Sequence, residues 1–226
     1  MLWRRERRRG TVGPQNESDQ GRPPAHHRLD PQAVFLNFPY DDQFRKLYLG
    51  YIAGICSFGL TPRTTLEIPG GERRLNRIVD LIRSCRYSFH DLSRVELDLR
   101  RPRTPRFNMP FELGSAVMAA MEHPAQHTWC VFESNARRVQ KSLSDLGGTD
   151  VYVHEGTIDG LFRELCNALV GVKRQPTVHQ MMYVYRALEE SCPGIMAKAG
   201  TSSPFGARVF ADMVVSANEA VKLQTP

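Results

Sequence analysis

One acidic residue stands out because of the apolar stretch that surrounds it. Residues 107–121 are predicted to form a helix with an Asn108 cap and a first-turn Pro110, apolar around nearly its whole circumference and therefore buried. Glu112 is the one charged residue of this stretch and lies in the first predicted turn, where the helix dipole would keep its carboxylate ionised. A desolvated, ionised carboxylate is a candidate nucleophile. The alternative is a solvent-facing Glu that only complements the dipole.

The elements that would position Glu112 alternate along the chain. Short apolar runs predict strands at residues 33–38, 60–68, 87–91, 129–132 and 151–154. Helical spacing predicts helices between and after them, at residues 41–59, 70–82, 107–121, 135–146 and 158–169. Strands that alternate with helices indicate a parallel sheet with right-handed crossovers. Five such strands predict an α/β fold of the flavodoxin-like order 2-1-3-4-5, with helices on both faces.

Charge and composition divide the chain into three predicted parts. Residues 1–31 form a basic tail with five arginines among its first nine residues and almost no apolar residues, so it is predicted to be disordered, and it lacks the apolar run of a secretory signal. Residues 32–173 hold the α/β domain. Residues 174–226 form a helical extension beyond a boundary at Pro176, with helices at 179–191 and 205–223. The tail accounts for much of the net charge of +6.

The rest of the composition excludes several classes of protein. No apolar run approaches the roughly 18 residues that cross a bilayer, so we expect no membrane span. The five cysteines are odd in number, are spread out and lack a CxxC spacing, which indicates buried thiols of a reducing, cytoplasmic compartment. No His, Cys and Asp cluster has the spacing of a metal site, and we expect neither a metal nor another cofactor.

Polar residues gather where the predicted strands end. In such folds, ligands bind outside the carboxyl ends of the strands. Asn37 ends the first strand, Asp91 ends the third, and the helix that carries Glu112 starts at the same edge. We therefore expect Asp91 and Glu112 to converge on one crevice. Asp and Ser residues at strand ends that only cap helices are the alternative. At Gly70-Gly71, followed by Arg73 and Arg74, a plain turn is favoured over a phosphate cradle.

Three motifs carry a resemblance to a known family. Residues 34–40 (VFLNFPY), 82–93 (IRSCRYSFHDLS) and 108–116 (NMPFELGSA) resemble the nucleoside 2-deoxyribosyltransferase-like group, which is structurally related to TIR domains. The resemblance covers roughly residues 33–170. It implies that Glu112 is the nucleophile at the anomeric carbon, and that Asp91 contacts the nucleoside or assists proton transfer. The substrate-binding residues predicted with it are Asn37, Phe38, Tyr40, Asp42, Ser93, Asn108 and Met109.

Two departures from that family bear on the substrate. Residues 37–40 replace the Gly-Pro turn that usually follows the first strand, and the loop at 94–106 contains five arginines. A basic lid over the crevice would favour a phosphorylated substrate such as a nucleotide or NAD, with Arg101 and Arg103 as the predicted phosphate contacts. A solvated surface loop is the alternative.

The predicted activity is transfer or hydrolysis at an N-glycosidic bond. A carboxylate near the anomeric carbon stabilises an oxocarbenium-like transition state or forms a covalent glycosyl-enzyme. We expect a small-molecule nucleoside, nucleotide or NAD as the substrate, and a homo-oligomer. The alternative is a catalytically silent, TIR-like signalling module that acts by self-association. Nucleic-acid binding ranks last, because the arginines lack interleaved aromatic residues and a recognition helix.

Overall fold

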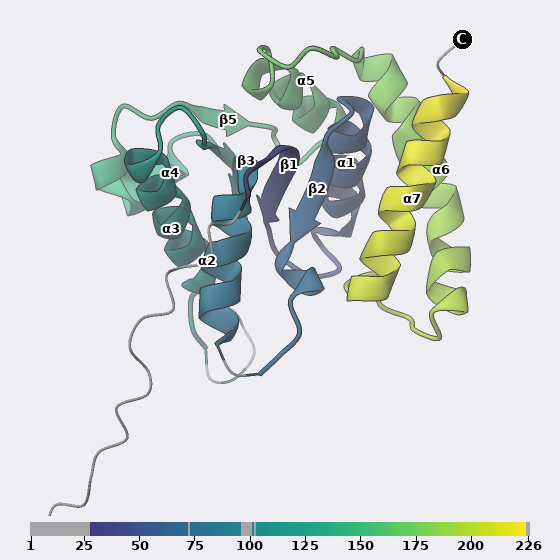
Figure 1. The fold of residues 1–226 in the computed structure, drawn as a ribbon, viewed down its shortest axis with the longest axis horizontal. Coiled ribbons are helices and arrows are strands. Elements are labelled where there is room, and N and C mark those ends of the chain that lie inside the picture. Colours follow the sequence, from purple (N-terminus) through teal and green to yellow (C-terminus); the bar gives the residue numbers. More distant parts are fainter. Residues whose placement is uncertain (1–27, 72, 96–100, 102, 225–226) are drawn as a thin grey trace, which may run out of the picture.

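The computed structural model describes residues 28–71, 73–95, 101 and 103–224. Its centre is one sheet of five strands, drawn in Figure 1: β1 (Asp30–Asn37), β2 (Thr61–Thr64), β3 (Cys85–Asp91), β4 (Thr128–Glu133) and β5 (Val151–Val153). Every neighbouring pair is parallel and the order is β2-β1-β3-β4-β5. The predicted fold class is confirmed.

Helices cover both faces of the sheet (Figure 1). One face packs against α1 (Arg45–Ser57) and α5 (Ile158–Ala168), and the other against α2 (Arg74–Ser84), α3 (Asn108–Glu122) and the short α4 (Arg138–Ser142). Side chains alternate along a strand. Thus Val34 and Leu36 join the cluster around α1, whereas Ala33 and Phe35 join the cluster of α2 and α3. This alternation also decides the face to which each polar residue at a strand end belongs.

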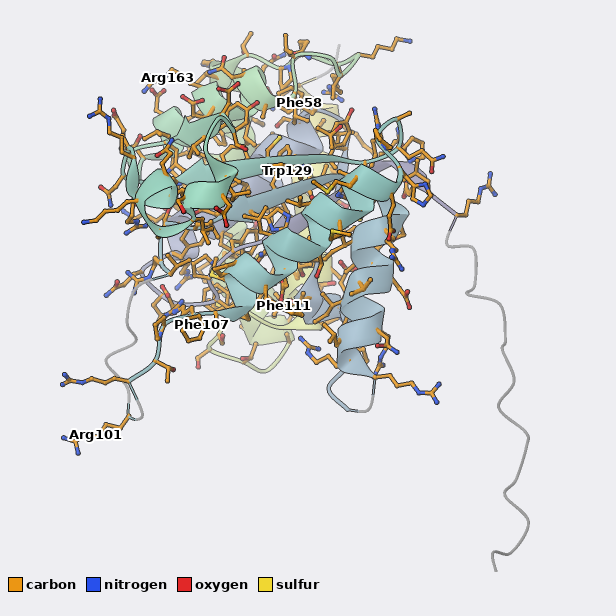
Figure 2. The ribbon with its side chains drawn as sticks, turned by 90° about the vertical axis from the view of Figure 1, so that its left-hand side faces the viewer. Phe58, Arg101, Phe107, Phe111, Trp129 and Arg163 are labelled. Carbon is orange, nitrogen blue, oxygen red and sulfur yellow. The ribbon has the colours of Figure 1, made fainter. Side chains whose placement is uncertain are left out.

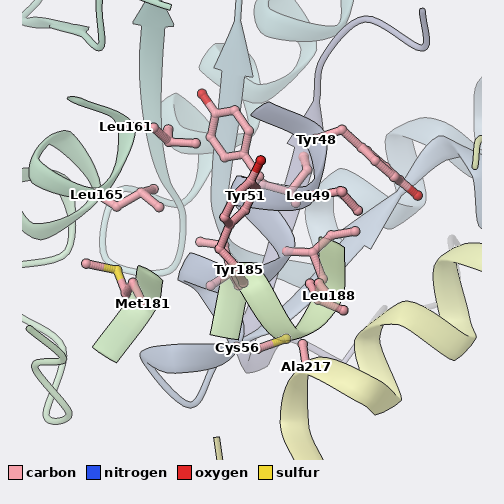
Figure 3. Packing of buried hydrophobic residues seen from close by; sticks show 14 of the residues in the cluster. Tyr48, Leu49, Tyr51, Cys56, Leu161, Leu165, Met181, Tyr185, Leu188 and Ala217 are labelled. Atoms are coloured by element: carbon pink, nitrogen blue, oxygen red, sulfur yellow. The ribbon is translucent and has the colours of Figure 1, made fainter. Parts of the chain in front are cut away.

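The largest core surrounds α1, which is buried on nearly every side. Figure 3 shows Tyr48 and Tyr51 of α1 among side chains of α5, α6 (Val178–Lys198) and α7 (Ala207–Leu223). Gly54 lets α5 approach closely, because a Cβ there would collide with Leu165. The two C-terminal helices therefore share the core of the α/β domain and cover α1 from outside.

Three predicted elements differ from the observed ones. The second strand ends at Thr64 instead of continuing to residue 68, because Thr64 and Glu67 form a capping box for a 3₁₀ turn, Thr65–Glu67. The helix predicted at 135–146 is reduced to α4 and a second 3₁₀ turn, Ser144–Leu146, after Arg137 in a left-handed conformation (φ 66°). The predicted tail overlaps β1, which starts at Asp30; residues 1–27 lie outside the described part.

Two further predictions concern the length of the helices. Within the described ranges, no helix is long and apolar enough to cross a membrane. The two predicted C-terminal helices are present. The first is longer than predicted and continues through Pro193 to Lys198.

Candidate active site

The two candidate catalytic carboxylates lie on opposite faces of the sheet. Asp91 points to the α1 face, where the Tyr51 hydroxyl contacts it, whereas Glu112 belongs to α3 on the other face. No hydrogen bond joins the two carboxyl groups among the described residues. The pKa of Glu112 is raised by burial and partly lowered by Arg74, and the charge of Asp91 is not among its causes. The predicted convergence of the two side chains is therefore not observed as a contact.

Glu112 is a nearly buried carboxyl group for which the described part of the chain supplies no hydrogen-bond partner. Its residue is 8% exposed, and it makes no hydrogen bond or ion pair with any residue that the structure describes. Burial raises the pKa of Glu112 from 4.5 to about 7, and the positive charge of Arg74 only partly opposes this rise. The rise corresponds to about 3 kcal/mol against the charged form. Glu112 is thus poised to gain or lose a proton near neutral pH.

This state of Glu112 corrects the prediction made from the helix. The expected Asn108 cap is absent, because the cap residue is Phe107 and makes no side-chain cap hydrogen bond. Since the helix starts at Asn108, Glu112 is its fifth residue and lies beyond the first turn, where the dipole acts most strongly. The dipole contributes roughly 0.3–1 kcal/mol, less than the cost of desolvation. Burial prevails over the dipole that was expected to keep Glu112 ionised, so the carboxyl group is ionised only in part at neutral pH.

The surroundings of Glu112 combine one aromatic hydroxyl and one arginine. The charge of Glu112 contributes to the raised pKa of Tyr40, which burial first of all brings to about 12. The Tyr40 hydroxyl lies 3.0 Å from Thr65 Oγ1. Arg74 donates to the carbonyl oxygens of Ile68 and Thr65, which hold its guanidinium while its charge acts on Glu112. We call Glu112, Tyr40, Thr65 and Arg74 the Glu112 site.

A buried hydrogen-bond network joins the start of α3 to the sheet. The Asn37 side-chain amide donates to the Met109 carbonyl oxygen at 2.9 Å and to His90 Nδ1 at 3.0 Å. Because Nδ1 accepts, Nε2 carries the ring proton, and burial lowers the pKa of His90 to about 3, which keeps the ring neutral. Nε2 has no partner among the described residues. The network ties β1 and β3 to α3 three residues before Glu112.

In contrast to Glu112, the Asp91 carboxylate accepts several hydrogen bonds from the protein. Its Oδ2 accepts hydrogen bonds from the Tyr51 hydroxyl at 2.8 Å and from His154 Nε2 at 3.0 Å, and its Oδ1 accepts one from the Ser93 backbone N–H at 2.9 Å. Burial by itself would raise the pKa of Asp91, but the hydrogen bonds from His154 and Ser93 outweigh it and hold the pKa below its usual value. Asp91 is an ionised residue that ties α1, β3 and the end of β5 together.

The contacts of His154 also exclude a Ser-His-Asp triad here. The Gly156 backbone N–H donates to His154 Nδ1 at 3.0 Å, so Nε2 carries the proton. That one nitrogen faces both Asp91 and the Ser93 hydroxyl. A triad needs the serine and the aspartate on different ring nitrogens. The cluster is therefore a structural tie beneath the edge of the sheet.

The other predicted substrate contacts divide into buried and exposed positions. Phe38 packs inside the core against the rings of Tyr40, Phe44, Tyr48 and Tyr51. Met109 and Ser93 are buried as well, and the amide nitrogen of Asn37 is used within the protein. Asp42 and Asn108 are exposed. Of the predicted substrate-binding residues, Tyr40 is the one whose pKa the Glu112 charge affects; the substrate contacts themselves stay predictions.

The arginine loop is tied down at both of its ends. Arg94 Nε and an Arg106 Nη lie 2.9 and 2.7 Å from the same Asp41 oxygen. Residues 96–100 and 102, which include Arg100, lie outside the described part. Arg101 and Arg103 are exposed, and Figure 2 shows Arg101 directed away from the body of the protein. In this conformation Arg101 does not cover the Glu112 site.

A cavity of about 550 Å³ lies at the opposite edge of the sheet. Its lining includes Pro31 at the start of β1, Tyr87 near the start of β3, Leu60 before β2 and Arg174 after α5. It is therefore at the amino ends of the strands and belongs to neither carboxylate.

The sequence analysis missed two features at the carboxyl ends of the strands. Arg74 was read as part of a plain turn, although an arginine opening a helix after Gly70-Gly71 was the available signal. The partners of Asp91 come from α1 and from beyond β5, and no sequence pattern links them. Comparison with known proteins adds no further assignment: no family model matches the chain, and neither the curated proteins nor the solved structures contain a match.

Proposed function

We propose that this protein cleaves or transfers the N-glycosidic bond of a nucleoside, nucleotide or NAD-like molecule, with Glu112 as the nucleophile. The observation that carries the proposal is the state of Glu112: a desolvated carboxyl group with no bonded partner among the described residues and a pKa of about 7. Carboxyl groups with shifted pKa values are typical of active sites, and a carboxylate that forms no ion pair is free to act as a nucleophile. The motif around Glu112 supports the same choice.

The reaction needs the ionised form of Glu112. A carboxylate oxygen attacks the anomeric carbon, the bond from that carbon to the base nitrogen breaks, and the base departs with the bonding electron pair and takes a proton. Water then hydrolyses the glycosyl ester, or a second base displaces Glu112 from it. The low polarity around Glu112 strengthens its attraction for the positive charge that develops on the sugar. The charge of Arg74 keeps a share of Glu112 ionised at neutral pH.

The test is a search for released base. The purified protein is incubated at pH 8 with a panel of nucleosides, 2′-deoxynucleosides, their 5′-phosphates and NAD, and free base is quantified by chromatography. We expect release from at least one of them, and base exchange when a second base is supplied to a transferase. Glu112→Gln, prepared in parallel, is the matched control, because it keeps the shape of the side chain and removes the charge. Equal release by both proteins contradicts the proposal.

A further inference from the structure

The outward side of α3 is an exposed apolar stripe. Four large side chains stand on it, with exposed fractions of 68% for Phe107, 57% for Phe111, 55% for Met118 and 70% for Met121. Figure 2 looks onto this side, with α3 in front and Phe107 and Phe111 at its amino-terminal end. The prediction that this helix is buried on all sides was therefore wrong, because only the half that faces the sheet is covered.

The stripe follows the period of the helix. Phe107, Phe111, Gly114, Met118 and Met121 are separated by four, three, four and three residues. This is the spacing of an α-helical face that packs against another helix. Glu112 lies on the covered half of the same helix, so a partner on the stripe would not touch it.

The stripe has the area of half a dimer core. Since a large side chain of this kind covers on the order of 200 Å² when fully exposed, the four expose roughly 500 Å². A standard interface buries about 800 Å² on each partner, of which somewhat more than half is apolar. The stripe thus supplies about the whole apolar share of one such interface. A solitary protein rarely leaves so much apolar surface in one place.

The order of residues along the stripe is complementary to itself. The two phenylalanines lie at the amino-terminal end and the two methionines at the carboxyl-terminal end, with Gly114 between them. A second copy related by a two-fold axis near Gly114 runs antiparallel, so each aromatic pair meets the partner's methionine pair, a favourable contact. Gly114 has open space around it, which lets the two helices approach closely.

We infer that the stripe is the docking surface for a second copy of this chain, with α3 packed antiparallel against the partner's α3 around Gly114. The dimer does not depend on the proposed reaction, because the stripe and Glu112 occupy opposite sides of α3.

Sedimentation of the full chain and of three variants tests this inference. The wild type is expected to sediment as a dimer, at twice the 25.7 kDa of one chain. Phe111→Asp should weaken the dimer about 30-fold or more, as expected of a residue at the centre of an interface. Gly114→Arg should also give monomers. A side chain at this position meets nothing in the protomer, and replacing a helical glycine raises helix propensity, so the monomer should keep its fold, as circular dichroism would show.

The matched control is Val215→Asp on α7. Val215 is 57% exposed, as Phe111 is, but belongs to the far side of the molecule. This variant should remain dimeric. A monomeric wild type overturns the inference, as does a dimer that survives both Phe111→Asp and Gly114→Arg. A dimer that Val215→Asp abolishes assigns the interface to α7 and overturns it as well. Base release is measured separately, and its presence or absence leaves these outcomes unchanged.

Discussion

The two carboxylates at the edge of the sheet are buried to a similar extent but are treated in opposite ways. Asp91, on the α1 face, accepts three hydrogen bonds and has a lowered pKa. Glu112, on the α3 face, has a pKa raised to about 7 by burial. The contrast teaches that burial alone does not decide the charge of a carboxyl group; its hydrogen-bond donors do. It also separates a residue that supports the fold from one that is available for chemistry.

Replacing Glu112 should have the largest effect on activity. Glu112→Gln and Glu112→Ala should reduce base release on the order of a thousand-fold or more while the fold persists, because the nucleophile has gone. At pH 8 Glu112→Gln should be at least as stable as the wild type, since no charge is then held in a desolvated position. Base release and chemical denaturation measure the two effects. A variant that is fully active, or one that is unfolded, would return Glu112 to a structural role.

Replacing Asp91 should act on stability instead. Asp91→Ala leaves the Tyr51 hydroxyl, His154 Nε2–H and the Ser93 N–H without their acceptor, which should cost about 3–5 kcal/mol of unfolding free energy. Asp91→Asn, which keeps one acceptor oxygen, should cost less. Urea denaturation provides the measurement. If Asp91→Asn kept wild-type stability but lost base release, the role in proton transfer implied by the family resemblance would be supported over the structural one.

The two residues should also differ in the direction of their pH dependence. The folded pKa of Glu112, about 7, exceeds its usual 4.5, so its contribution to stability is complete below pH 4.5 and is lost as the pH rises through about 7. The loss should reach about 3 kcal/mol by pH 8, seen as a fall in the unfolding free energy of the wild type relative to that of Glu112→Gln, which lacks the titrating group.

Asp91 should show the reverse. Its folded pKa lies below 3.8, so its contribution is present above that pH and is lost as the pH falls through the folded pKa.

Activity should rise as the pH increases through about 7, since the nucleophile Glu112 must be ionised. A pH profile that falls over this range would assign Glu112 the role of an acid.

The smallest effects should come from the arginines. Arg74→Met removes the charge that, among the described residues, lowers the pKa of Glu112, so the midpoint of the activity profile should move to higher pH. The double variant Arg101→Ala, Arg103→Ala removes more charge at exposed positions and should leave that midpoint unchanged. A raised KM for a 5′-phosphate, but not for its nucleoside, would support the predicted phosphate contact. An equal shift of the midpoint in both proteins would contradict the specific effect of the Arg74 charge on the pKa of Glu112.

The sequence by itself determined the architecture. The alternation of apolar strands with helices is enough to predict the parallel sheet, because a crossover connection has one favoured hand, and five such strands favour the common order 2-1-3-4-5. It also placed Asp91 and the Glu112 helix at that edge. The strand lengths were less certain: a local capping box ended β2 at Thr64, and this depends on side-chain hydrogen bonds that a hydrophobic pattern does not encode.

Only the tertiary structure decided the state of each side chain. That Asp91 points to α1 and Glu112 lies across the sheet follows from the strand alternation combined with the packing of helices far apart in sequence. The donors of Asp91 come from Tyr51 and His154, which are 40 and 63 residues away. Glu112 received no such donor among the described residues, and α3 left one side uncovered. A pKa and an exposed surface depend on every atom nearby, and the fold alone brings those atoms together.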